Sequence, residues 1–180
     1  MNRRSCLTWI VRAFQAVAGA IVAVPCLGFV LAPLRRGTAT RRGMIRVTPV
    51  DSLPVGTPVR RDVITDRRDG FTHYGMGRLG AVWILRQNEN LTAPDALRVW
   101  QVICPHLGCG LRFEKPVDRF TCPCHSSAFD LTGRRLHGPA PRDMDRLTHR
   151  VSEPDPAGKR WLEVEYHTFR TGVEQQIAQT

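Results

Sequence analysis

Two short segments combine cysteine and histidine at spacings typical of metal ligands. The first, CPHLGC, begins at Cys104, and the second, CPCHSS, begins at Cys122. Fifteen residues separate the last candidate ligand of the first segment from the first of the second. Thiolates and imidazoles in this number are the ligand set of tetrahedral zinc, among other centres. The sequence therefore predicts a metal centre whose candidate ligands are Cys104, His106, Cys122 and His125.

Each segment also carries one cysteine more than such a centre needs, Cys109 in the first and Cys124 in the second. A structural zinc site would account for four ligands and leave this pair unassigned. A purely disulfide-based module would account for cysteines and leave the two histidines unexplained. The residue types by themselves keep both alternatives open.

The elements that must position these segments are short β runs. They are rich in Val, Ile, Trp and Thr, several alternate polar with apolar residues, and turn residues separate them. No amphipathic pattern of helical period persists between 45 and 165. We therefore expect a mainly β domain of two packed antiparallel sheets, interrupted by the cysteine-rich region at 104–141. The predicted strands lie at 44–50, 58–64, 81–87, 97–103, 147–153 and 160–166.

The N-terminus has a different composition. Residues 13–34 form an apolar run of 22 residues whose only polar side chain is Gln15. That length crosses a hydrocarbon core of roughly 30 Å as a helix. Ahead of it, Arg3 and Arg4 resemble a twin-arginine export signal, although Asn2 precedes the pair. We expect an uncleaved signal anchor at 1–34 that crosses the membrane once.

The positive charge of the chain is concentrated at the same end. Of the 26 Lys and Arg residues, seven arginines lie within residues 1–42, which hold no acid, so 19 basic residues face 16 acidic ones elsewhere. No aromatic-studded basic stripe appears in the remainder, and we expect no nucleic-acid partner. The Gly- and Pro-containing stretch at 35–53 is predicted to be a flexible tether, followed by a folded domain at 54–180.

CPHLGC and CPCHSS resemble the two cluster-binding segments of Rieske iron–sulfur proteins from cytochrome bc-type complexes. The resemblance implies one [2Fe–2S] cluster, with Cys104 and Cys122 on the inner iron and His106 and His125 on the outer iron. It also implies the fold: a Rieske-type antiparallel β-sandwich with a small cluster-binding subdomain at about 103–141, preceded by one N-terminal transmembrane helix.

Further site residues follow from the same resemblance. Cys109 and Cys124 are expected to form the disulfide that characterises this class, which requires an oxidising compartment. Ser127 is expected to donate a hydrogen bond to a bridging sulfide, and Leu107 to shield the cluster at the quinol pocket. Phe129 stands where high-potential members commonly have a tyrosine that donates to a ligand sulfur, and Ser126 stands where glycine is usual. The loop expected to cover the cluster consists of Gly138, Pro139, Ala140 and Pro141.

The function implied is that of an oxidoreductase subunit of the quinol:cytochrome c reductase type, active within a complex. His106 or His125 would accept a proton from quinol, menaquinol or ubiquinol, while the cluster takes the electron. The expected partners are a membrane cytochrome b subunit and a c-type cytochrome. The domain is expected on the outer, periplasmic side of a bacterial cytoplasmic membrane. The alternative is the Rieske subunit of an arsenite-oxidase-like molybdenum enzyme.

Overall fold

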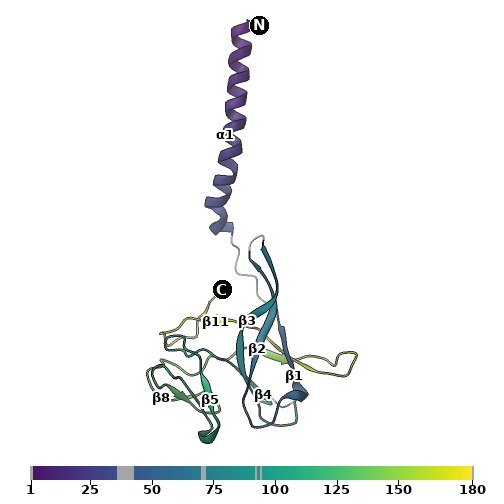
Figure 1. Cartoon of the computed structure of the whole chain (residues 1–180), viewed down its shortest axis with the longest axis vertical. Coiled ribbons are helices and arrows are strands. Elements are labelled where there is room, and N and C mark those ends of the chain that lie inside the picture. Colours follow the sequence, from purple (N-terminus) through teal and green to yellow (C-terminus); the bar gives the residue numbers. More distant parts are fainter. Residues whose placement is uncertain (1, 36–42, 70–71, 92, 94, 180) are drawn as a thin grey trace. The chain divides into compact units, whose positions relative to one another are not determined.

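The computed structural model describes residues 2–35, 43–69, 72–91, 93 and 95–179. The chain divides into two compact units, one up to Arg41 and one from Arg42 onward. Figure 1 shows the first as the single helix α1 and the second as an assembly of β strands. Each unit is described by itself below.

Helix α1 spans Arg3–Arg35. Its side chains from residue 2 to residue 30 are exposed, including large apolar ones such as Trp9, Phe14 and Phe29. A helix that is apolar around its whole circumference is typical of a membrane span. The stretch Arg3–Leu31 is long and apolar enough to cross a membrane by length and composition. The predicted N-terminal apolar helix is therefore confirmed, and it begins earlier than the apolar run itself.

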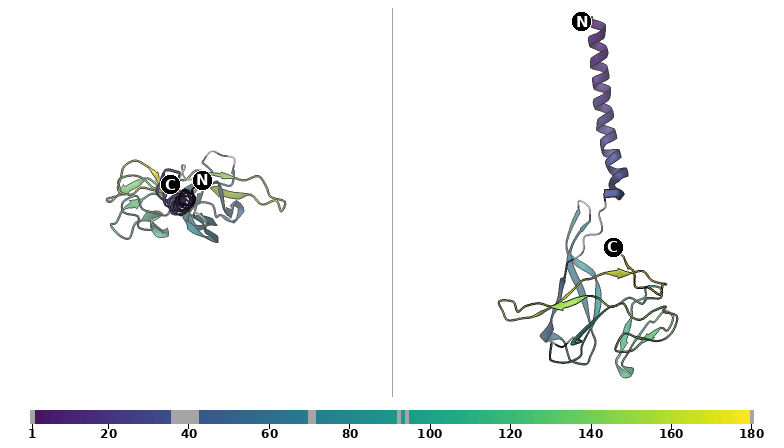
Figure 2. Two further views of the ribbon diagram at one scale, coloured as in Figure 1. Left: turned by 90° about the horizontal axis from the view of Figure 1, so that it is seen from above. Right: turned by 180° about the vertical axis from the view of Figure 1, so that it is seen from behind.

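The described residues of the second unit form four antiparallel sheets. One sheet has the order β2-β3-β4 and a second has the order β1-β10-β9, while four short strands form a third sheet, β5-β6-β7-β8. Strands β11 and β12 pair with each other near the C-terminus. Figure 2 shows the short strands of the third sheet beside the first sheet. The strands are β1 (Ile45–Pro49), β2 (Val59–Asp69), β3 (Thr72–Arg86), β4 (Leu97–Gln101), β5 (Arg112–Glu114), β6 (Arg119–Thr121), β7 (Ala128–Phe129), β8 (Arg135–His137), β9 (His149–Val151), β10 (Trp161–Val164), β11 (Thr168–Phe169) and β12 (Ala178–Gln179), with short 3-10 helices at Val50–Ser52 and Lys115–Val117.

The second half of β3 is buried on both faces of its sheet. All five residues at 81–85 are buried, and successive side chains of a strand point to opposite faces. Val82 and Ile84 join the core shared with β1, β9 and β10, whereas Trp83 joins the core that contains Phe120 of the third sheet. A strand covered on both faces reads as a continuous apolar run, which is why AVWIL shows no alternation. This central sheet connects the sandwich to the cysteine-rich region.

The structure confirms the mainly β class with antiparallel sheets and places a strand in each of the six predicted segments. β1 pairs with β10 from Ile45 to Pro49, with a shift of register between Arg46 and Thr48, so the later part of the predicted tether at 35–53 is built into the domain. Residues 36–42 of the tether lie outside the described residues. No strand was predicted at β5 to β8, β11 and β12. Each of these strands has only two or three residues, which carry too little pattern for a prediction.

Candidate metal centre

The first cysteine–histidine segment is a closed loop that follows β4. The backbone N–H of Cys104 donates to the carbonyl oxygen of Cys109 at 2.8 Å, and the N–H of Gly108 donates back to Cys104 at 3.1 Å. Gly108 has a φ of 84°, which is the left-handed region that glycine adopts at little cost. These bonds fold the loop so that its first and last residues are neighbours.

The second segment repeats this arrangement. The N–H of Cys122 donates to the carbonyl oxygen of Ser127 at 2.8 Å, and the N–H of Ser126 donates back to Cys122 at 3.2 Å. Ser126 has a φ of 57° and so occupies the position of Gly108 in the first loop. The backbone is therefore strained at Ser126, since a residue with a Cβ adopts this region unfavourably.

A disulfide joins the two loops. The sulfur atoms of Cys109 and Cys124 are 2.03 Å apart and their Cα atoms are 6.5 Å apart. The predicted pairing of the two surplus cysteines is thus confirmed. The sulfur of Cys122 lies within 4.8 Å of both disulfide sulfurs. Since a metal binds a thiolate, Cys109 and Cys124 are removed from the ligand set.

The two predicted cysteine ligands are free thiols in the interior. Cys104 is fully buried and Cys122 is 3% exposed. Burial raises the pKa of the Cys104 thiol to about 11, an increase to which the neighbouring Cys122 thiol also contributes. The backbone N–H of His106 and the Ser127 hydroxyl act in the opposite direction through hydrogen bonds to the sulfur. A buried thiol pair of this kind is stabilised as thiolate by a cation, which compensates the charge that burial disfavours.

The two predicted histidine ligands lie side by side toward the surface. The ring centroids of His106 and His125 are 4.8 Å apart, and the ring planes are nearly perpendicular. His125 is exposed and His106 is half-buried. The Nδ1 atom of His106 is buried and has no hydrogen-bond partner among the described residues. The site therefore has thiols on its inner side and imidazoles on its outer side.

The loop at 138–141 is fixed against the second ligand loop. The backbone N–H of Ala140 donates to the Ser127 hydroxyl at 3.1 Å, and the Arg135 guanidinium donates to the carbonyl oxygen of Ala140 at 2.8 Å. A Cβ on Gly138, whose φ is 96°, would lie 2.4 Å from the Cα of Ser127. Only glycine permits this close approach. The covering loop is therefore held in place by Ser127 and Gly138.

The remaining predicted site residues divide into buried and exposed groups. Ser127 and Phe129 are fully buried behind the second loop. Leu107 is 63% exposed on the first loop, and Pro139 is exposed on the covering loop. Pro141 is half-buried. The expected roles of these residues toward a cluster and a quinol remain predictions.

The C-terminal segment backs the first ligand loop, a contact that the sequence did not predict. The N–H of Gly172 donates to the carbonyl oxygen of Pro105 at 2.8 Å. Arg142 holds this segment by donating to the carbonyl oxygens of Arg170 and Val173, and its guanidinium also pairs with Asp145 at 2.8 Å. The pair is almost fully shielded from solvent. The only signal in the sequence is an arginine and an aspartate three residues apart, which does not indicate such a contact.

The model of the Rieske [2Fe–2S] domain family matches residues 43–170. The chain belongs to this family. The match covers the sandwich, both cysteine–histidine loops and the covering loop. The predicted family is therefore confirmed, and with it the [2Fe–2S] cluster as the cofactor.

Curated relatives of this Rieske chain match its cluster region over part of their length. It is 36% identical over 81 residues to a cytochrome b6-f complex iron–sulfur subunit of Parasynechococcus marenigrum (strain WH8102), which is 44% of either chain. It is 40% identical over 73 residues to cytochrome b6-f complex iron–sulfur subunit 1 of Nostoc sp. (strain PCC 7120), covering 40% of this chain and 38% of that one. The chain thus spans about two fifths of the relatives it matches.

Among solved structures, a chain of a hyperthermophilic respiratory complex III overlays 81% of this chain and 98% of its own length. The TM-score is 0.41 and the sequence identity is 18%.

The side chains at the site fit a Rieske cluster. Two unbridged, buried thiols and two adjacent imidazoles supply two sulfur and two nitrogen donors, the combination that a Rieske cluster requires. The unpartnered Nδ1 of His106 is accounted for if it binds the outer iron.

Proposed function

We propose that this Rieske chain is the electron-transferring iron–sulfur subunit of a membrane complex that oxidises quinol and passes the electron to a c-type cytochrome. One observation carries the proposal: two adjacent imidazoles form the outer side of the site, with two free thiols behind them. The curated relatives named as subunits of cytochrome b6-f complexes support the same class of activity.

In this proposal Cys104 and Cys122 bind the inner iron, and His106 and His125 bind the outer iron. The bound cluster would supply a one-electron acceptor and, in its oxidised state, would draw electron density from its imidazole ligands. The protein surrounds the thiolates with apolar side chains and leaves the imidazole edges toward solvent. An imidazole nitrogen can therefore accept a proton from an incoming hydroxyl.

The quinol is proposed to approach the outer side of the site. There His125 is the more exposed of the two imidazoles, and Leu107 presents an apolar surface on the same loop as His106. A quinol hydroxyl would donate a hydrogen bond to one imidazole nitrogen and then transfer its proton to that atom. Leu107 would exclude water from the contact by packing on the quinone ring, since water competes for the same hydrogen bond.

The partners and location proposed follow from the anchor. Helix α1 would place the domain at the surface of a bacterial cytoplasmic membrane, on the periplasmic side, beside a cytochrome b subunit. In this proposal the domain carries the electron by moving between the quinol site and the cytochrome c.

The experiment that tests this function is a redox titration of the full chain in detergent, with its cluster, from pH 5 to 11. We expect a positive midpoint potential near neutral pH that falls by roughly 59 mV per pH unit at alkaline pH, which indicates one proton lost per electron. A strongly negative midpoint that is independent of pH would contradict quinol oxidation. Zinc in place of iron and acid-labile sulfide would contradict the cluster itself.

A further inference from the structure

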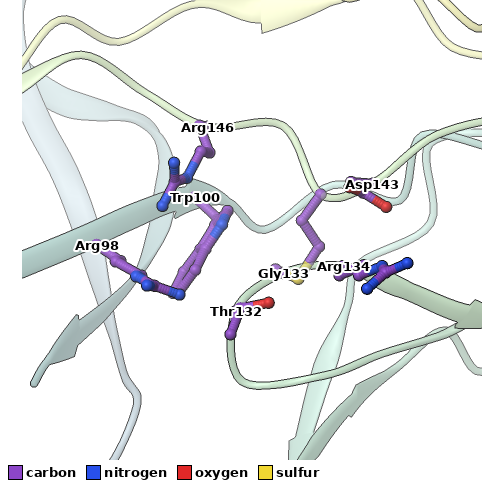
Figure 3. A pocket seen from close by; sticks show the side chains of 8 residues that line it. Arg98, Trp100, Thr132, Gly133, Arg134, Asp143 and Arg146 are labelled. Carbon is purple, nitrogen blue, oxygen red and sulfur yellow. The ribbon is translucent and has the colours of Figure 1, made fainter. Parts of the chain in front are cut away.

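A polar pocket, separate from the metal centre, lies at the junction between β4 and the turn that joins β7 to β8. We call it the junction pocket. Its volume is about 420 Å³. Its lining residues are Arg98, Trp100, Thr132, Gly133, Arg134, Asp143, Met144 and Arg146. Figure 3 shows Arg98 and Arg146 on either side of the Trp100 ring, with Arg134 and Asp143 across the pocket. None of these residues belongs to the cysteine–histidine loops.

The sheet geometry brings three hydrogen-bond donors of the junction pocket together. Arg98 and Trp100 are two residues apart on β4, so their side chains leave the same face of the strand. Arg146 is the bridge partner of Trp100 on the neighbouring segment, which places its side chain on that face as well. The convergence of these donors is therefore a consequence of strand register.

Two of these three side chains have a buried nitrogen that donates to no acceptor among the described residues. The Nε1 atom of Trp100 and the Nε atom of Arg98 are buried, and neither has a hydrogen-bond partner among the described residues. Buried N–H groups are almost always paired in folded proteins, so two unpaired donors at one pocket indicate a missing acceptor. Within the described part of the chain, Arg98 and Arg146 form no ion pair with a carboxylate, whereas the charge of Arg134 acts on the neighbouring carboxylate of Asp130.

The charge of the junction pocket defines the kind of acceptor. Three guanidinium groups face one carboxylate, Asp143, whose Oδ1 already accepts the backbone N–H of Arg135 at 2.7 Å. The residues that line the pocket thus carry a net charge of about +2, which Asp130 partly offsets at Arg134, and an oxyanion would neutralise the remaining positive charge. Guanidinium groups bind phosphate oxygens through paired N–H donors, a geometry for which arginine is preferred over lysine.

We propose that the junction pocket binds a phosphoryl group, with Arg98, Arg146 and the indole N–H of Trp100 as its donors. Arg134 adds positive charge at the opposite side. Because β4 belongs to the central sheet and residues 132–134 belong to the cluster-binding part, the bound group would connect these two parts. The phosphoryl group can come from a soluble phosphate compound or from the headgroup of a phospholipid at the membrane surface.

The test is calorimetric titration of the full, cluster-containing chain in phosphate-free detergent buffer. Inorganic phosphate is added at constant ionic strength, with chloride as the reference anion. We expect one phosphate per chain with a dissociation constant of about 1 mM or tighter. Arg98→Gln and Arg146→Gln are each expected to weaken binding by about ten-fold or more, since each removes a charge-assisted donor. Trp100→Phe removes only the indole donor and is expected to weaken it less.

The matched control is Arg112→Gln, which removes the same charge from an exposed arginine on β5, outside the pocket. Its affinity for phosphate should stay within about two-fold of the unaltered chain, because surface charges are screened by salt. Equal loss in the control and in Arg146→Gln would overturn the proposal, as would the absence of saturable binding. Arg146 is exposed, so its variant tests the site even if Arg98→Gln does not fold.

A second measurement distinguishes a phospholipid headgroup from a soluble phosphate compound as the source of the phosphoryl group. The full chain is kept in micelles of a detergent that contains no phosphate, and its thermal midpoint is measured with added phosphatidic acid and, separately, with added inorganic phosphate. A rise with phosphatidic acid that Arg146→Gln abolishes would identify the lipid headgroup. A rise only with inorganic phosphate would identify a soluble source. No rise with either, in a protein that binds no phosphate by calorimetry, would overturn the proposal.

Discussion

At the scale of single residues, the fifth position of each ligand loop carries the same left-handed backbone. Gly108 adopts it in the first loop and Ser126 in the second, and both donate a backbone hydrogen bond to the first residue of their loop. The second loop therefore retains a conformational cost that the first loop avoids. Glycine is usual at position 126 in the family, and the repeated hydrogen-bond pattern accounts for this preference, because the fifth position of both loops has a left-handed backbone.

Ser126→Gly should stabilise the domain. The left-handed conformation costs a residue with a Cβ roughly 1–2 kcal/mol, and the larger backbone entropy of glycine in the unfolded chain offsets about half of this. We expect a net gain of about 0.5–1 kcal/mol, measured as a higher thermal midpoint of the cluster-containing protein. Gly108→Ser is the matched reverse change and should lower the midpoint. A lower midpoint in Ser126→Gly would show that the serine side chain stabilises the loop.

Phe129→Tyr should raise the midpoint potential of the cluster. Phe129 is fully buried in the core that contains Cys104 and Cys122, where a hydroxyl can donate to a ligand sulfur. One hydrogen bond that favours the reduced state by ~1–1.5 kcal/mol raises a one-electron potential by roughly 40–65 mV. The potential is measured by redox titration, with Phe113→Tyr on β5 as the control. An unchanged or lower potential would refute the role given to Phe129.

At the scale of elements, the C-terminal segment supports the first ligand loop through Arg142. The pair of Arg142 with Asp145 is shielded from solvent, so removing one partner leaves a buried charge without compensation. We expect Arg142→Met to lower the free energy of unfolding by about 3–5 kcal/mol. It should also increase hydrogen exchange at the Gly172 amide.

The double variant Arg142→Met, Asp145→Leu removes both charges and should recover part of the lost stability. Denaturant unfolding of the two single variants and the double variant measures the coupling. Strictly additive losses would show that the pair itself contributes nothing to holding the segment. The exposed Arg112→Met serves as the control for loss of an arginine.

The sheet of β1, β10 and β9 carries a pH-dependent contribution to stability. Glu163 on β10 accepts hydrogen bonds from Arg150 at 2.8 Å and from Arg46 at 3.2 Å, on the two flanking strands. The hydrogen bond from Arg150 is the largest effect that holds the pKa of Glu163 below its usual value of 4.5, and Arg46 adds to it, although partial burial opposes both. A carboxyl with a lowered pKa stabilises the fold above its unfolded pKa and loses this contribution as the pH falls through the folded value.

We therefore expect Glu163→Gln to reduce the thermal midpoint at pH 7 and to have a smaller effect as the pH falls below about 4.5. The two proteins should converge because the protonated glutamate resembles glutamine in charge. Thermal unfolding from pH 3 to 7 checks this. A difference that stays constant with pH would show that the stabilisation does not come from the carboxylate charge.

At the scale of the whole molecule, α1 and the β domain are two units whose sequences serve different purposes. The arginine pair ahead of the apolar run is proposed to direct export, and the domain then carries the cluster. Substituting Arg3→Lys and Arg4→Lys together should retain the domain on the inner side of the membrane. Protease treatment of spheroplasts measures this, with Arg12→Lys as the control. Unchanged exposure of the domain would exclude the twin-arginine interpretation.

Much of this molecule could be predicted because its strongest signals are local. The apolar run gives α1, β-branched and aromatic segments give the long strands, and the two cysteine–histidine loops identify the family. The short strands at 112–137 could not be predicted, since two or three residues carry no periodicity. The contact of Gly172 with Pro105 and the junction pocket join residues that are far apart in the sequence. Such contacts are determined by strand register and packing.

The position of the Cys122 sulfur has a consequence for the order in which the protein is assembled. The Cys122 sulfur lies within 4.8 Å of both sulfurs of the Cys109–Cys124 bond. As a free thiolate it is placed to attack this disulfide and to form a new disulfide with one of the two cysteines, which releases the other as a thiolate. Iron at Cys122 occupies the attacking sulfur and prevents the exchange. In a chain that receives its cluster first, Cys109 and Cys124 are the two cysteines of the β domain that are left to pair, whereas in the reverse order all four cysteines of the domain can exchange partners. Loss of the cluster would then be hard to reverse, because shuffled sulfurs cannot accept a new one.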